Sequence, residues 1–185
     1  KDDKQIVYYI ATVDISRDDV NVYANYHAND PSLGWAMSRV SDQMAAAQKR
    51  HSDPSDAANY VEHYNAVVGV NADFYNMTNG APNGALVMEG VEYHSGASAA
   101  SFFAILKDGT AMIGSSGEYA SYKDQIQEAV GGSVYLVKDG KSVVDSSAVS
   151  YNSRHSRTCV GITAEGKVVL MVLDGRQEPF SAGGS

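Results

Sequence analysis

The chain has 185 residues, of which 44% are apolar and 19% charged, with a single cysteine. A chain of this length buries roughly 70% of its unfolded surface, so we expect one globular domain over residues 1–185. Fourteen basic against 22 acidic side chains give a formal charge of −8, which excludes nucleic acid as the main partner and argues against an anionic membrane. No apolar run approaches the roughly 20 residues that cross a bilayer.

The first elements expected along the chain are two strands. Residues 5–13 are apolar and rich in β-branched and aromatic side chains, and residues 20–26 alternate apolar with polar positions. The polar stretch at 16–19 is typical of a turn. We therefore predict an N-terminal hairpin.

Two helices are expected next. Apolar residues recur at intervals of four and three through residues 33–50, after an Asp-Pro-Ser start signal. A shorter helix fits residues 54–64, with Asp53 as its N-cap and Pro54 at its first position.

Three later segments each consist of two apolar runs joined by a short turn that contains glycine: 102–113, 134–144 and 158–173. Each is predicted to be a β-hairpin, because glycine supplies the positive φ that such turns need. Between the first two, a helix is expected over 121–130, stopped by Gly131-Gly132. The pattern predicts an α+β domain of mostly antiparallel or mixed sheet, built from hairpins, with about three helices.

Two apolar runs lead directly into polar residues. Residues 66–70 precede Asn71 and Asp73, and residues 168–173 precede Asp174. Runs this apolar are typical of central strands covered on both faces, so the polar residues that follow are expected at the rim of a sheet, where sites are often built. The alternative is that they only make hydrogen bonds within turns.

Arginines gather near the second of these runs. Arg154, Arg157 and Arg176 fall within 23 residues, and His155 lies between the first two. An antiparallel hairpin would bring Arg157 and Arg176 to the same end, where their guanidinium groups would suit a phosphate or carboxylate. The alternative is a surface ion pair with Asp174, which contributes little.

Other kinds of site find no support in the sequence. The five histidines show no metal-ligand spacing, and the glycine-rich stretches match neither a phosphate-binding loop nor a dinucleotide fingerprint. One cysteine forms no intrachain disulfide, and Cys159 is expected to be a small core residue. We therefore expect no metal and no cofactor.

A set of motifs resembles one known family. In chain order these are Gly69-Val70-Asn71-Ala72-Asp73-Phe74-Tyr75, residues 84–90, Lys107-Asp108-Gly109-Thr110, residues 131–140, Arg157-Thr158-Cys159-Val160-Gly161 and residues 168–176. Their order and spacing are similar to those of the phosphodiester glycosidases. The resemblance covers residues 66–185, whereas residues 1–65 carry no motif and resemble the variable N-terminal part of secreted bacterial members.

The resemblance implies a secreted or cell-surface hydrolase that removes a sugar from a sugar-1-phosphodiester, with the export signal removed or outside this chain. Its substrate would be a glycosyl phosphodiester or a cell-surface glycan. Three residues are expected to be catalytic: Asp73, Asp174 and Arg157. Six are expected to bind substrate: Asn71, Arg154, His155, Arg176, Ser181 and Gly183.

The chain departs from the family at its end. The family continues to an Asp-Gly-Gly-Gly-Ser motif, whereas this chain stops at Gly184-Ser185. We therefore expect that the C-terminal portion of the domain is missing. A truncated sheet would expose an edge, so a homo-oligomer or a separate C-terminal fragment is an expected partner.

Two other functions remain open. The fold could serve as a non-catalytic carbohydrate-binding or cell-surface module, since the twelve tyrosines and one tryptophan offer faces on which sugars stack. A phosphodiesterase that cleaves the P–O bond is the third reading. Sugar identity, anomer and the choice between the two carboxylates are not readable from the sequence.

Overall fold

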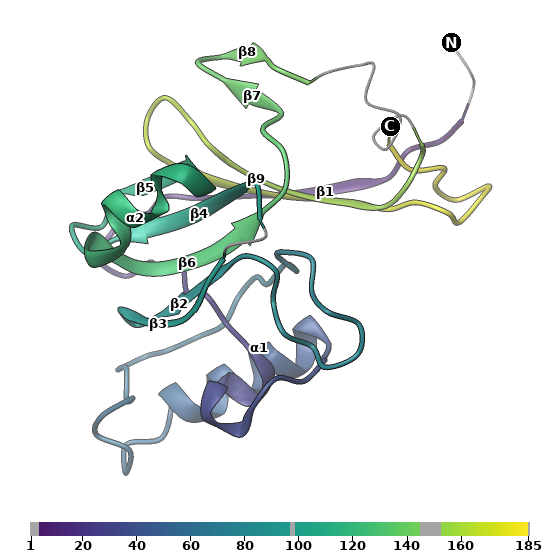
Figure 1. The fold of residues 1–185 in the computed structure, drawn as a ribbon. Coiled ribbons are helices and arrows are strands. Elements are labelled where there is room, and N and C mark those ends of the chain that lie inside the picture. Colours follow the sequence, from purple (N-terminus) through teal and green to yellow (C-terminus); the bar gives the residue numbers. More distant parts are fainter. Residues whose placement is uncertain (1–3, 97–98, 145–152, 185) are drawn as a thin grey trace.

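The computed structural model describes residues 4–96, 99–144 and 153–184. Within them ten strands form three antiparallel sheets, accompanied by two α-helices and four 3₁₀ helices (Figure 1). The α+β class and its antiparallel hairpins are thus confirmed. None of the helices in the described part of the chain is both long and apolar enough to cross a membrane.

The largest sheet has five strands in the order β3-β2-β6-β4-β5. Their bounds are β2 Ala85–Met88, β3 Val91–Ser95, β4 Ser101–Leu106, β5 Ala111–Ser115 and β6 Ile126–Gly132. The β4–β5 hairpin is the one predicted over 102–113, and Gly109 in its turn has φ +87°. The β2–β3 hairpin, which the sequence did not single out, turns through Glu89 and Gly90, both with positive φ.

Alternation along the strands gives this sheet two apolar faces. Ala85 and Val87 point into one cluster, which also holds Phe102, Ala104 and Ile126 and is covered by the short helix α2 (Tyr119–Tyr122). Leu86 and Met88 point the opposite way, into a second cluster with Tyr26, against which Trp35 packs. The five-stranded sheet is therefore packed on both faces, and the N-terminal part of the chain, including Tyr26 and Trp35, covers the second face.

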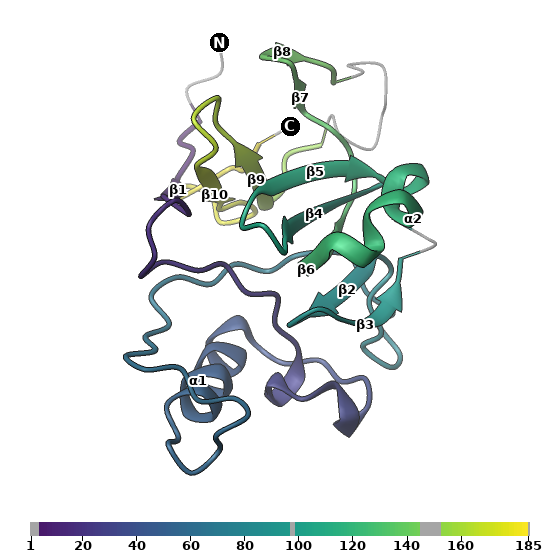
Figure 2. The same cartoon turned by 90° about the vertical axis from the view of Figure 1, so that its left-hand side faces the viewer.

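A second sheet has three strands in the order β1-β10-β9. Its strands are β1 Tyr8–Val13, β9 Arg157–Ile162 and β10 Val168–Leu173. The β9–β10 hairpin confirms the prediction over 158–173, and β10 is central because it pairs on both sides. Both views show this sheet at the end of the molecule away from α1 (Val40–His51), with the N- and C-terminal ends close together (Figures 1 and 2).

The third sheet is the small hairpin β7 (Val137–Lys138) and β8 (Lys141–Ser142) inside the predicted segment 134–144. The 3₁₀ helices cover His27–Asn29, Pro31–Leu33, Ser116–Glu118 and Lys123–Gln125. Cys159, expected in the core, is only half-buried in β9.

The N-terminal helices differ from expectation. The first begins at Val40, because Asp30 caps only a 3₁₀ turn that Gly34 ends at φ +82°. The second, predicted over 54–64, does not form. The Asp53 carboxylate instead accepts from the N–H and hydroxyl of Ser55, and isolated turns follow.

The helix predicted over 121–130 is also wrong. The helical turns end at residue 125, and residues 126–132 form β6, which pairs with both β2 and β4. Ile126 and Ala129 are buried in the core cluster on one face of this sheet, with exposed fractions of 0% and 1%. Pairing with segments distant in sequence overrides the local helical pattern here.

Two predicted strands are not strands. Residues 20–26 do not pair with β1, whose partner is β10; the N–H of Ala24 donates instead to the Glu128 carboxylate. Residues 66–70 run outside any sheet, with Val67 76% exposed. A Cβ on Gly69 would lie 2.5 Å from the sulfur of Met44, so this segment packs on α1 rather than between strands.

Candidate functional site

The arginine cluster lies at one end of the β9–β10 hairpin. The antiparallel register pairs Arg157 with Leu173, so the residues just before β9 and just after β10 meet at that end. Arg154 and His155 come from the first side, and Asp174 and Arg176 from the second. The sequence predicted Arg157 and Arg176 at the same end of an antiparallel hairpin, and the observed register places them there.

His155 connects the two sides of the cluster. Its Nδ1 accepts a hydrogen bond from Nε of Arg176 at 2.9 Å, which puts the proton of the neutral ring on Nε2. Partial removal of water from around the ring lowers the pKa of His155, and the positive charges of Arg176 and Arg157 lower it further. The imidazole is therefore neutral at pH 7 and orients Arg176.

The other two arginines are held by backbone carbonyls. Arg157 donates to the carbonyl of Ser153 at 2.9 Å, and Arg154 donates to that of Gly183 at 3.2 Å. Among the described residues the Asp174 carboxylate forms no ion pair with these arginines. The surface ion pair considered as an alternative is therefore not formed within that part of the chain.

The backbone beneath the cluster is packed without room for side chains. His155 and Gly184 form an isolated bridge, as do Gln177 and Ser181. A Cβ on Gly183 would lie 2.6 Å from the carbonyl oxygen of His155, and Gly183 has φ +86°. Gly175 is equally confined, since its Cβ would lie 2.5 Å from the N–H nitrogen of Ser156.

Ser181 and the N-terminal segment tie this end together. Ser181 is fully buried; its hydroxyl donates to the carbonyl of Asp174 at 2.7 Å and accepts from the N–H of Val7 at 3.2 Å. The carbonyl of Val7 accepts from the N–H of Asp174, and that of Gln5 from Ala182. Ser181, predicted to bind substrate, thus connects Asp174 to the N-terminal segment. Sequence reasoning did not select residues 5–7 for this site, because they carry no motif.

Asn71 reaches the same end of β9. Its Oδ1 accepts a hydrogen bond from the hydroxyl of Thr158 at 2.5 Å, next to Arg157. Asp73 follows two residues later, so its Cα lies within about 7 Å of that of Asn71. The exposed Asn71 amide therefore lies at the arginine end of β9, on the face to which Thr158 points, and the chain then turns toward the five-stranded sheet.

Asp73 is held at that sheet by backbone contacts. Its carboxylate accepts from the N–H of Gly84, and a Cβ on Gly84 or Gly131 would lie 2.5 Å from its Oδ2. Burial raises the pKa of Asp73, and the N–H groups of Gly84 and Phe74 and the ring of His94 oppose that increase. Two carboxylates of the predicted site thus occupy different surroundings.

His94 is a neighbour of this site that sequence reasoning did not select. It lies on β3, and its Nδ1 donates to the carbonyl of Gly84 at 2.7 Å, which supports the loop that holds Asp73. Its only sequence signal is a histidine inside an alternating strand. Within the described ranges, no three His, Cys, Asp or Glu side chains lie close enough to hold a metal ion.

A comparison with protein families identifies one family. The family model described as phosphodiester glycosidase matches residues 64–184, more than half of the chain. One similar solved structure is the zebrafish N-acetylglucosamine-1-phosphodiester alpha-N-acetylglucosaminidase catalytic domain auto-inhibited by pro-peptide, at 22% identity and a TM-score of 0.49. The likeness covers 57% of this chain and 40% of that one, so this chain spans less than half of that domain. No curated protein sequence matches the chain.

Proposed function

Because this chain belongs to the phosphodiester glycosidase family, we propose that it hydrolyses the glycosidic C–O bond of a sugar-1-phosphodiester. The products are a free sugar and a phosphate monoester. The observation that carries the proposal is the cluster of Arg154, Arg157 and Arg176 at one end of the β9–β10 hairpin, beside the exposed amide of Asn71.

The arginines bind the phosphodiester. A guanidinium group matches two phosphate oxygens with parallel N–H donors and keeps its charge at every working pH. His155 supports this role, because it holds Arg176 by accepting from Nε and leaves the terminal NH₂ groups of that guanidinium for the ligand. The substrate phosphate therefore lies between Arg157 and Arg176.

Bond cleavage follows from the leaving group. The phosphate leaves as a monoester whose developing negative charge is stabilised by the arginines, so C–O cleavage needs little protonation of the leaving oxygen. Water adds its oxygen to the anomeric carbon, the phosphate keeps the bridging oxygen, and the proton of water passes to a carboxylate. Asn71 hydrogen-bonds sugar hydroxyls on the Thr158 side.

Asp174 suits the carboxylate role better than Asp73. It directly follows β10 at the arginine end, and its main chain is fixed by Ser181 and Val7. Asp73 already accepts from Gly84 at the neighbouring sheet, which fits a residue that positions the Asn71 segment. Asp174 thus activates water or stabilises the oxocarbenium-like centre.

A matched pair of substrates tests the reaction. The protein is given an N-acetylglucosamine-1-phosphodiester and the corresponding aryl glycoside, in water enriched in ¹⁸O. We expect sugar release from the phosphodiester alone, with the heavy oxygen in the sugar. Heavy oxygen in the phosphate would instead identify a phosphodiesterase, and saturable binding without any hydrolysis would identify a carbohydrate-binding module.

Two substitutions test the residues. We expect Arg157→Ala and Asp174→Asn each to lower kcat/KM about 100-fold or more, the usual effect of removing a group that meets transition-state charge. Arg17→Ala is the control, because this exposed arginine pairs only with Asp19. Unchanged turnover in both site variants, with folds intact by circular dichroism, would remove these residues from the mechanism.

A further inference from the structure

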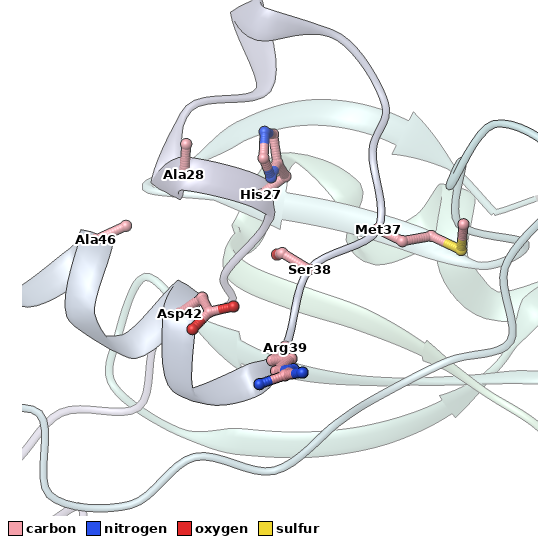
Figure 3. Close-up of a pocket in the computed structure, with 7 residues that line it drawn as sticks. All are labelled: His27, Ala28, Met37, Ser38, Arg39, Asp42 and Ala46. Carbon is pink, nitrogen blue, oxygen red and sulfur yellow. The ribbon is translucent and has the colours of Figure 1, made fainter.

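An open cavity of about 590 Å³ lies at the start of α1, which Figure 1 shows away from the β1-β10-β9 sheet. Its volume falls in the range of small-molecule sites. Seven residues line it: His27, Ala28, Met37, Ser38, Arg39, Asp42 and Ala46. Figure 3 shows the Asp42 carboxylate on the first turn of α1 and Ser38 on the segment before it, both on the side of the 3₁₀ helix that carries His27, with Met37 directed away from them.

Two polar atoms in this lining have no partner. Nδ1 of His27 and the hydroxyl of Ser38 are both covered by protein atoms and form no hydrogen bond in the described structure. Leaving such a group unpaired is unfavourable, so a ligand that supplies the missing partner gains from it. A serine hydroxyl reaches a new partner by one rotation about its Cα–Cβ bond, and Ser38 loses no hydrogen bond when it turns into the cavity.

The charged groups of the lining are also available. Arg39 occupies the N-cap position of α1, where its carbonyl accepts from the N–H groups of Asp42 and Gln43, and its guanidinium group makes no cap hydrogen bond. The Asp42 carboxylate has one long contact, from the hydroxyl of Ser41 at 3.4 Å. The lining therefore offers a guanidinium group that only donates and a carboxylate that only accepts. It also offers the His27 ring nitrogen and the Ser38 hydroxyl, which have no hydrogen bond in the described structure.

The presence of one positive and one negative group in the lining determines which class of ligand fits the cavity. A phosphate or carboxylate would gain from Arg39 and be repelled by Asp42, and a simple cation would meet the reverse. A neutral ligand with adjacent hydroxyls gains from both, because each hydroxyl donates to a carboxylate and accepts from a guanidinium or an imidazole N–H. We propose that this cavity is an accessory binding site for one sugar residue of a glycan, separate from the arginine cluster.

The test uses methyl glycosides of glucose, mannose, galactose and N-acetylglucosamine as probes. The protein, labelled with ¹⁵N, is titrated with each glycoside. We expect saturable amide shifts at residues 27–28 and 37–42 for at least one of them. Absence of saturable shifts there for all four would overturn the proposal, as would a stronger response of the same amides to inorganic phosphate or to glycylglycine.

Variants separate this site from the proposed reaction. Asp42→Asn is expected to weaken binding of the responsive glycoside at least tenfold, and Ser38→Ala to weaken it severalfold without loss of thermal stability, since its hydroxyl has no partner to lose. Asp18→Asn, an exposed carboxylate elsewhere, is the control. Unchanged affinity in both site variants contradicts the proposal. Hydrolysis of a small phosphodiester should be unchanged in all three, so failure of the proposed reaction leaves this binding test intact.

Discussion

At the residue scale, His155 holds Arg176 in the cluster that we propose as a phosphate site. It can hold Arg176 only while Nδ1 is unprotonated, because a protonated imidazole has two donors and repels a guanidinium. Its lowered pKa, caused by desolvation and by Arg176 and Arg157, keeps it in that state at neutral pH. The cluster's geometry is therefore coupled to the protonation of one ring.

Turnover should follow that protonation. A lowered pKa means that the neutral ring persists below the ordinary histidine range, and that the Arg176 contact is lost as the pH falls through the lowered value. We expect an acidic limb in the profile of kcat/KM at a pH below about 6.5. In His155→Asn, whose Oδ1 accepts from Arg176 without titrating, this limb should disappear. The interpretation fails if wild type and variant share the same limb, with His63→Asn as the remote control.

Gly183 provides a second prediction at this scale. It has φ +86°, and its Cβ position lies against the carbonyl of His155, whereas Gly109 has φ +87° with nothing within 4 Å. Gly109→Ala should cost about 1–2 kcal/mol for the left-handed backbone alone. Gly183→Ala should cost more and also lower turnover, because His155 must move. Urea unfolding and kcat/KM measure the two effects, and equal costs in both variants would contradict the close packing.

At the scale of elements, β6 joins the N-terminal chain to the central sheet through one carboxylate. Glu128 is 4% exposed, and its two oxygens accept from the N–H groups of Ala24 and Glu89, both at 3.0 Å. Burial raises the pKa of Glu128 to about 8, with the two N–H donors opposing the increase. The element that sequence periodicity mistook for a helix thus carries a buried ionisable anchor.

Stability should depend on pH through this residue. The folded pKa lies above the unfolded value, so the folded state binds more protons between about pH 4.3 and pH 8, and this contribution to stability is lost as the pH rises through that window. Glu128→Gln removes the titration. We expect the unfolding free energy of the variant, relative to wild type, to rise by on the order of a few kcal/mol from pH 5 to pH 9. Glu62→Gln, at an exposed position, should show no such trend; parallel curves for Glu128→Gln and wild type would refute the raised pKa.

At the scale of the whole molecule, the N-terminal strand belongs to the site. The family model begins at residue 64, yet β1 forms the outer strand beside β10, and the carbonyl of Val7 accepts from the N–H of Asp174. The first and last segments of the chain therefore build one end of the molecule together, as both views of the fold show (Figures 1 and 2).

Deletion tests this dependence. A variant without residues 1–13 leaves β10 without one neighbour and Ser181 without the N–H of Val7. We expect a lower melting temperature and loss of turnover, even though every motif remains. A variant lacking only residues 1–3 serves as the control and should retain both. Full activity of the longer deletion would show that β1 is dispensable for the site.

Much of the C-terminal half was predictable because its signals are local. Glycine turns at 109, 140 and 166 fix three hairpins whose strands are neighbours in sequence. The α+β class and the placement of Arg157 and Arg176 at the same end of one hairpin therefore follow from residue order alone. The family followed from the same local motifs.

Tertiary structure alone decided the rest, because those contacts join segments distant in sequence. Pairing with β2 and β4 made residues 126–132 a strand, and pairing with β10 took β1 away from residues 20–26. The contact of the Asp73 carboxylate with the N–H of Gly84 holds Asp73 at the five-stranded sheet. The periodicity of a short segment carries no information about strand pairing with distant segments. The turns and the order of charged residues at the end of a hairpin, in contrast, are determined by the sequence itself.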